Sequence, residues 1–279
     1  MKYLLSFLAV LTLATMACGF SVDLPSVPTP GPEVTDEITV ATPDSEATRL
    51  KISFGAGELT LSPGAADMLV DGTATYDIPN FKPEVIQNGS DIEIKQGQLK
   101  SLNVSNFKNE WDLKLGETPM ELEINAGAYK GHYEFGGLAL TDLTIKDGAS
   151  DVNVSFSESN PTKMSVFRYE TGASSVKLTG LANANFSTLI FNGGAGDYTL
   201  DFSGDLKQDA TVRSETGFGN LLLVIPKDVD ARVTIEGGPV NVNHSSGWGQ
   251  SNQTYTQDGS GPNLTIIVKM GAGNVTITD

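Results

Sequence analysis

The sequence predicts an all-β protein, a single-stranded β-solenoid similar to a parallel β-helix, with an N-terminal β cap. Composition is the first observation: 30 of 279 residues are glycine, and Val, Ile, Leu and Thr dominate over strong helix-forming runs. The second is a recurring motif, clearest in Phe191–Leu200. There an apolar-x-apolar triplet leads into a Gly-Ala turn, and a second apolar-x-apolar triplet follows.

Apolar and polar residues alternate within each motif, which places one side of each strand in a core. Through much of the chain the motif recurs at a step of roughly 20 residues, the size of one repeat unit. One unit cannot bury its apolar residues alone, whereas stacked units share a continuous core. The pairs before and after each turn are Leu50/Ile52 with Leu59/Leu61, Leu122/Ile124 with Tyr133/Phe135, Leu143/Ile145 with Val152/Val154, Phe167/Tyr169 with Val176/Leu178, Leu189/Phe191 with Tyr198/Leu200, Val212/Ser214 with Leu221/Leu223, Ala231/Val233 with Val240/Val242, and Ile266/Val268 with Val275/Ile277.

Each unit is expected to turn at a glycine, which accepts positive φ and close backbone approach because it has no Cβ. These turn glycines are Gly55, Gly148, Gly172, Gly194, Gly217, Gly237 and Gly271. Short polar residues that can satisfy turn amides follow the turn in five units: Asp151, Ser175, Asp197, Asn220 and Asn274. The competing fold, an antiparallel sandwich of hairpins, would place dissimilar turns about every 8–12 residues.

The N-terminus is typical of a bacterial lipoprotein signal peptide. The apolar run Tyr3–Ala14 has the length of a signal peptide and is too short for a comfortable membrane span. Cys18 follows Ala17 as in the lipoprotein box, although Thr15 stands where that pattern usually has leucine. We expect residues 1–17 to be removed and Cys18 to carry the lipid; the alternative is an ordinary signal peptide beside an incidental cysteine.

Three further regions follow the signal peptide. Residues 18–47 combine prolines and acidic residues with no Lys or Arg, which predicts a disordered tether. Residues 48–118 are expected to form the N-terminal β cap, with Tyr76 and Trp111 packed inside it, and 119–279 to form the solenoid. A polar insertion, Asn243–Asn263, interrupts the repeats, and the last strand, Leu264–Thr278, is expected to close the stack.

The charge balance excludes one class of partner. The chain has 34 acidic and 18 basic residues, a formal net charge of −16, so it repels phosphate backbones and we expect no nucleic-acid partner. One cysteine and two distant histidines cannot form a disulfide or a His-rich zinc site. We expect no metal and no cofactor. Calcium at the turns is a weaker alternative, because Gly193–Asp197 only partly matches the calcium-binding nonapeptide.

Catalysis must be considered because some parallel β-helices are polysaccharide lyases or hydrolases. A glycosidase needs two carboxylates facing each other across a groove. The candidate acids Asp151, Asp197 and Asp201 stand at positions that normally satisfy turns, and Arg168, Arg213 and Arg232 are predicted to face solvent beside apolar neighbours. We therefore expect no catalytic residues.

The insertion supplies the candidate binding residues His244, Trp248 and Tyr255. An aromatic pair in a loop rich in Gly, Ser and Asn could stack on a sugar or on a side chain of a partner. The alternative is a hairpin whose Trp248 folds over the end of the solenoid.

Four blocks resemble a bacterial family, the toast-rack proteins, which are related to LiaF-type antibiotic-response proteins and to adhesin-like β-solenoids. They are Ile52–Leu61, Val70–Val85, Trp111–Leu115 and Met120–Gly127, and the likeness covers about residues 48–242. The resemblance implies an envelope-associated β-solenoid and no catalytic residues. LiaF-type regulators have membrane-spanning helices, which this sequence does not contain.

Together these features predict an exported, lipid-anchored protein of the bacterial cell envelope that presents a solenoid for adhesion, scaffolding or envelope sensing. Its expected partners are the membrane, through the lipid, and an envelope protein or glycan. The alternatives are a polysaccharide-active enzyme on the same fold and an accessory component of an envelope-stress response.

Overall fold

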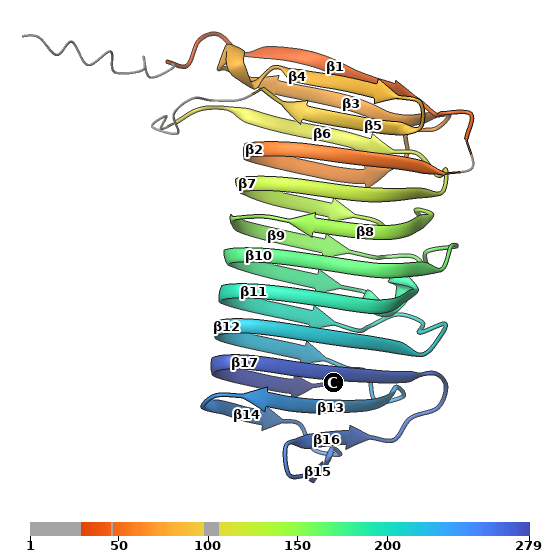
Figure 1. The fold of residues 1–279 in the computed structure, drawn as a ribbon, viewed down its shortest axis with the longest axis vertical. Coiled ribbons are helices and arrows are strands. Elements are labelled where there is room, and N and C mark those ends of the chain that lie inside the picture. The colour runs from red at the N-terminus through yellow and green to blue at the C-terminus, as the bar shows by residue number, and fades with distance from the viewer. Residues whose placement is uncertain (1–28, 46, 98–105) are drawn as a thin grey trace, which may run out of the picture.

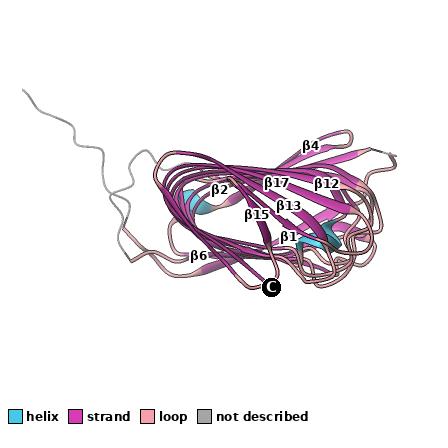
Figure 2. Cartoon of the chain, turned by 90° about the horizontal axis from the view of Figure 1, so that it is seen from below, coloured by secondary structure: helices cyan, strands magenta, loops and turns pink. Residues whose placement is uncertain are grey.

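A computed structural model describes residues 29–45, 47–97 and 106–279, which form one tall stack of β-strands (Figure 1). The predicted signal peptide, Cys18 and the first part of the tether lie outside the described residues. Seen along the stack, the strands form two layers joined by a bend on one side and by loops on the other (Figure 2). We call the bend the corner, and the parts of each unit before and after it the first and second arms.

Most units are single long strands that continue through the corner. These are β2 (Thr48–Pro63), β7 (Met120–Glu134), β10 (Met164–Thr179), β11 (Phe186–Asp201), β12 (Ala210–Val224) and β17 (Asn263–Thr278). Two units are interrupted at the corner: β8 (Leu140–Lys146) with β9 (Ala149–Ser155), and β13 (Asp230–Gly237) with β14 (Val240–His244). Two 3-10 helices, η1 (Pro79–Phe81) and η2 (Leu181–Ala184), lie in the connections.

Neighbouring units pair in parallel and in register, as β10 with β11 and β11 with β12 show. The predicted solenoid is therefore the observed fold, and the antiparallel sandwich is excluded. The alternating pattern correctly identified the inward side chains: those of every predicted apolar pair are buried except Val240 and Val242, which are half-buried near the end of the stack.

Two units are aligned differently from the prediction. In the unit of β13 and β14, Val233 pairs with Ile266 and Val242 with Val275, so the predicted pairs Ala231/Val233 and Val240/Val242 lie two residues too early.

The other unit is that of β7. In the ladder between β2 and β7, Leu59 pairs with Gly131 and Leu61 with Tyr133, so β7 has no extra residues in its turn. Gly131 takes the inward position that Leu59 holds in β2. A Cβ there would lie 2.9 Å from the ring of Tyr129 and 3.1 Å from that of Tyr133, so two tyrosines fill the space that a leucine fills elsewhere.

The cap extends further toward the N-terminus than predicted. It consists of β1 (Val34–Ala41), β3 (Met68–Tyr76), β4 (Pro83–Asn88), β5 (Asp91–Gln96) and β6 (Asn109–Leu115). Strand β1 pairs antiparallel with β3 along its whole length, so this part of the predicted tether is an ordered strand. Its Ile38 and Val40 are buried, and Tyr76 donates a hydrogen bond from its hydroxyl to Asp36 Oδ2 at 2.6 Å.

The order of layers departs from the order of the chain at the C-terminal end. Strand β17 pairs with β12 on one side and with β13 and β14 on the other, so it lies inside the stack and does not close it (Figure 1). The insertion forms the antiparallel hairpin β15 (Gly249–Ser251) and β16 (Thr254–Gln257), and β16 pairs with β13. This hairpin covers part of the end of the stack.

A column of stacked glycines occupies the corner. A Cβ on Gly172 would lie 2.4 Å from the carbonyl oxygen of Gly148, and one on Gly194 would lie 2.4 Å from that of Gly172. The same close approach recurs through Gly217, Gly271 and Gly238 down the stack. Among the seven predicted turn glycines only Gly237 has a left-handed φ, at 121°. Close backbone approach is therefore the reason for glycine along this column, whereas positive φ is the reason two residues later, at Gly57, Gly219 and Gly273.

Gly194→Ala tests that reason. The added Cβ meets backbone, which cannot rotate away, so we expect a loss of about 1–3 kcal/mol in stability and a lower melting temperature. Gly31→Ala is the control, because its Cβ would meet only Asp77 O, at 3.6 Å. Circular-dichroism melts that show equal stability for both variants would contradict the account.

Candidate interaction surface at the glycine corner

Beside the glycine column runs a column of alanines with one aromatic exception. The ladder registers place one residue from each of seven units in line: Ala56, Ala128, Ala149, Ala173, Ala195, Phe218 and Ala272. Phe218 is 66% exposed and has the largest exposed fraction among the large hydrophobic side chains of the described residues. A phenyl ring therefore projects from an edge that otherwise carries almost no side chains.

A shallow depression of about 500 Å³ lies at the corner, and its lining includes Gly217, the residue before Phe218, but not Phe218 itself. Its floor includes Gly217 and Gly271, whose lack of side chains leaves the backbone accessible. Its polar rim comes from Asn192, Glu215 and Lys269, which are in register on the first arms of β11, β12 and β17. An amide, a carboxylate and an ammonium group can hydrogen-bond to one polar ligand, and the exposed ring of Phe218, one residue beyond Gly217, offers a separate surface for stacking.

Sequence analysis missed Phe218, although the sequence contains its signal. Within the Gly-Ala turn most units place a small residue after the glycine, and only the unit of β12 has Phe. When the units are aligned, Phe218 is the large residue at a position where most other units have a small one. The core pattern does not reveal it, because Phe218 contributes nothing to the core.

The second arms present a polar column next to the corner. Asn220 donates a hydrogen bond from Nδ2 to Asp197 Oδ1 at 2.6 Å, and Asn274 donates to Asn220 Oδ1 at 2.8 Å. Asn241 extends the series by donating to Asn274 Oδ1 at 3.4 Å. The sequence correctly predicted that Asp197, Asn220 and Asn274 occupy equivalent positions, and the structure adds Asn241 to them. Their side chains bond to those of neighbouring layers, and not only to turn amides as expected.

Inside the corner, hydroxyl groups surround an acidic side chain. The Tyr169 hydroxyl donates to Asp147 Oδ2 at 2.7 Å, and that of Thr171 donates to Oδ1. The Tyr129 hydroxyl lies 3.4 Å from the same Oδ2, and it accepts a hydrogen bond from Tyr133 at 3.1 Å. Burial raises the pKa of all three tyrosines, and the nearby Asp147 carboxylate raises it further. These contacts suit a structural network, since the hydroxyls satisfy one another and the carboxylate.

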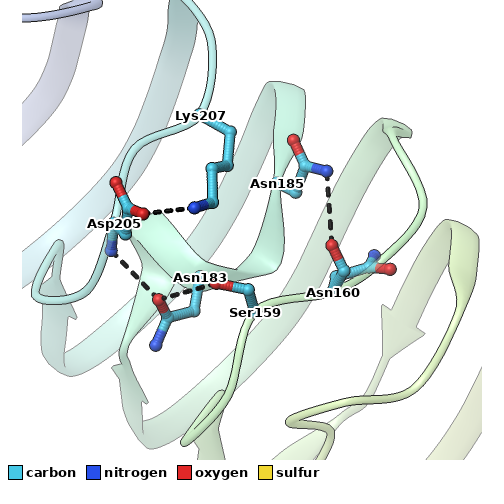
Figure 3. Close-up of polar contacts among 6 residues, drawn as sticks. All are labelled: Ser159, Asn160, Asn183, Asn185, Asp205 and Lys207. Atoms are coloured by element: carbon cyan, nitrogen blue, oxygen red, sulfur yellow. Dashed lines mark hydrogen bonds and ion pairs between the residues drawn. The ribbon is translucent and has the colours of Figure 1, made fainter.

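The loop edge opposite the corner is held by asparagines (Figure 3). Asn160 donates from Nδ2 to Leu140 O at 2.8 Å, and Asn185 donates to Asn160 O at 3.3 Å. Asn183 accepts a hydrogen bond from the Asp205 backbone at 3.0 Å, and Lys207 forms an ion pair with the Asp205 side chain. These bonds join successive loops, so this edge is a structural spine and offers few free polar groups.

The predicted binding residues lie at the end of the stack but are not all accessible. Trp248 and Tyr255 are 7% and 5% exposed and belong to the main core, as the alternative interpretation of the insertion predicts. Only His244 is exposed, and its ring centroid lies 5.3 Å from that of Tyr255. Their packing closes the core beneath β13, so the aromatic pair is not free to stack on a ligand.

The candidate acids are not arranged as a catalytic pair. The strand that carries Ser175, β10, lies between Asp151 and Asp197 in the ladder. The Asp197 carboxylate accepts a hydrogen bond from the side-chain amide of Asn220, and the Asp201 carboxylate accepts one from the backbone N–H of Ser203. Across the described ranges no group of three or more His, Cys, Asp or Glu side chains could hold a metal ion. In the same ranges, no helix is both long and apolar enough to span a bilayer.

Comparison with known families identifies the N-terminal half of the chain. Residues 29–167 match the family model of the N-terminal domain of toast_rack, DUF2154. This region is a toast-rack domain. The expected resemblance is thereby confirmed, and the toast-rack domain includes the cap and continues into β10. A comparison with curated proteins gives no match.

Solved structures with similar folds include a "putative cell adhesion protein" from Clostridium sporogenes, at 22% identity and a TM-score of 0.47, covering 88% of this chain and 99% of that one. A "putative adhesin" from Bacteroides fragilis aligns at 10% identity and a TM-score of 0.39, covering 88% and 97%. A "putative lipid binding protein" from Parabacteroides distasonis aligns at 13% identity and a TM-score of 0.35, with the same coverage.

The tyrosines around Asp147 give a pH prediction. Their folded-state pKa values exceed the unfolded value of about 10, so their contribution to stability is complete below pH 10 and is lost as pH rises above it. We expect phenolate absorbance from Tyr133 and Tyr169 to appear only together with unfolding. Comparing alkaline titrations of the protein with those of Tyr169→Phe, by absorbance and circular dichroism, checks this. Full tyrosine ionisation near pH 10 with the fold intact would contradict it.

Proposed function

We propose that this protein is a non-catalytic component of the bacterial cell envelope that binds envelope glycan through the corner of its solenoid. Phe218 is the observation that carries the proposal. An exposed phenyl ring on a bare edge costs solubility and contributes nothing to the core, which favours a role in binding.

The exposed ring of Phe218, together with the polar depression that begins at Gly217, favours a sugar polymer as the ligand. A sugar ring has an apolar face that stacks on an aromatic ring and a rim of hydroxyls that hydrogen-bond to amide, carboxylate and ammonium groups. Asn192, Glu215 and Lys269 provide these three groups around the depression. Because the depression is shallow and lies on an open edge, it suits a polymer that passes across the corner.

Anchorage follows from the N-terminus. The signal peptide and Cys18 would place a lipid before the tether, and the first described residues enter the cap at one end of the stack (Figure 1). The solenoid would then extend away from the membrane and present its corner to the surrounding envelope. Adhesion to glycan and scaffolding between membrane and wall are both served by this arrangement.

Phe218→Ala tests the glycan site. We expect binding to purified bacterial cell-wall polysaccharide, measured by co-sedimentation, to weaken about 5–30-fold, because an interface aromatic is typically worth about 1–2 kcal/mol. Val85→Ala is the matched control, since Val85 is another exposed hydrophobic side chain, 43% exposed, but lies in the cap. Equal binding by both variants, or no binding by the unchanged protein, would contradict the proposal.

Cys18→Ala tests the anchor. Without the thiol no lipid can be attached, so the full-length variant is expected to leave the membrane fraction and appear in the soluble fraction. Fractionation of cells followed by immunoblotting measures this. A variant that stays with the membrane as firmly as the unchanged protein would rule out the lipid anchor, while leaving the glycan site open.

A further inference from the structure

The dipeptide Asn-Gly occurs twice in the sequence, and the fold places the two copies in very different surroundings. They are Asn88-Gly89 and Asn192-Gly193. An asparagine before a glycine is chemically fragile, because its side-chain carbonyl carbon can close a five-membered ring with the next backbone nitrogen. Glycine has no side chain to shield that nitrogen. Whether the ring closes therefore depends on how freely the backbone moves at each place.

Asn88-Gly89 lies at the tip of the β4–β5 hairpin in the cap (Figure 1). Strand β4 ends at Asn88, β5 begins at Asp91, and only Gly89 and Ser90 connect them. Asn88 and Gly89 are both exposed, and a Cβ on Gly89 would meet nothing within 4 Å. The Gly89 N–H donates no hydrogen bond to any described residue. The attacking nitrogen is therefore free and open to solvent.

This hairpin can also open locally. Among the described strands β4 pairs with β5 alone, and the pair of Asn88 with Asp91 is the last before the turn. No residue of β4 is fully buried. An edge hairpin of this kind frays at a small cost in free energy, because few packed side chains oppose the opening. Fraying lets Asn88 rotate until its side chain reaches the nitrogen of Gly89.

Asn192-Gly193 has neither of these freedoms. It lies within β11, which pairs in register with β10 on one side and with β12 on the other. A Cβ on Gly193 would lie 2.7 Å from the ring of Tyr198, so the backbone there is tightly packed as well. Ring closure at Asn192 would require a strand in the middle of the stack to leave both of its neighbours.

We propose that Asn88 is a site of spontaneous deamidation and that the fold protects Asn192 from the same reaction. Hydroxide removes the amide proton of Gly89, and the nitrogen forms a bond to the side-chain carbonyl carbon of Asn88. The bond from that carbon to the side-chain nitrogen breaks, and ammonia leaves with a proton taken from water. Water then adds to either carbonyl of the cyclic imide and reopens it as aspartate or isoaspartate. No electrons are transferred, and water is the only reagent consumed.

Both products weaken the hairpin. A carboxylate at position 88 stands directly opposite Asp91, and like charges at opposite positions of an antiparallel pair destabilise it. Arg49, the ladder neighbour of Asp91, already forms an ion pair with Glu121 at 2.9 Å. In isoaspartate the main chain passes through the side chain and gains one carbon, which shifts the turn relative to the ladder. Deamidation therefore loosens the β4 edge of the cap.

Peptide mass spectrometry tests the site. The purified full-length protein is incubated folded at mildly alkaline pH, and samples taken over time are digested and analysed for conversion of each amide to the acid. We expect the peptide with Asn88 to show the mass shift of this conversion and to separate into two acidic forms. The peptide with Asn192 should remain unchanged.

Incubation in denaturant is the matched control, because both dipeptides are then free and should convert alike. Equal conversion at Asn88 and Asn192 in the folded protein would overturn the proposal, since the fold would not select between them. An Asn88 that stays intact in the folded protein, or that fails to convert even in denaturant, would overturn it as well.

Hydrogen exchange tests the consequence for the cap. After incubation we expect faster amide exchange in residues 83–96 of the unchanged protein, measured against a fresh sample. Asn88→Gln, incubated in the same way, should keep the exchange rates of the fresh sample, because glutamine would have to close a larger ring. Converted protein whose exchange rates equal those of the fresh sample would overturn the loosening of β4. These outcomes are independent of the glycan site at Phe218.

Discussion

Close contact between backbones at the corner is the constraint on which this structure depends. The glycines of neighbouring units approach so closely that a Cβ on Gly194 would lie 2.4 Å from a carbonyl oxygen. A side chain at that position would force the layers apart and shift the register of both arms. The arms bury their inward residues only when the units stack in register. The core therefore depends on residues without a side chain at the corner.

The same constraint shapes the surface. An edge made of glycine and alanine has no side chains of its own to bind with, so one larger residue there gains unusual exposure, as Phe218 does. In-register stacking also aligns outward residues into columns, which explains the bonds from Asn274 to Asn220 and from Asn220 to Asp197. Binding groups on such a protein arise where one unit departs from the repeat, as the unit that carries Phe218 does.

The sequence predicted the repeating units correctly. It did not predict the pairing between strands that lie far apart in the chain. Alternation identified the inward residues even for Ser214, which is fully buried, and the turn pattern located the glycine column. Local pattern could not show that Val34–Ala41 becomes a strand, because its partner β3 lies far along the chain. It could not show that β17 enters the stack between β12 and β13, since every unit has the same pattern and any of them can stack on any other. The apolar alternation marks only core residues and so does not point to Phe218, which lies outside the core. The aromatic content of the insertion does not reveal that Trp248 is buried.

The most direct test of in-register stacking is a pair of disulfides across the layers near the C-terminus. Asn220 and Asn274 are partners in the β12–β17 ladder, whereas β17 separates Asn220 from Asn241. Adjacent strands lie about 4.8 Å apart, within reach of a disulfide, and alternate strands do not. Asn220→Cys with Asn274→Cys should therefore form an intramolecular disulfide, and Asn220→Cys with Asn241→Cys should not. The opposite result would mean that the units stack in chain order and that the register described here is wrong.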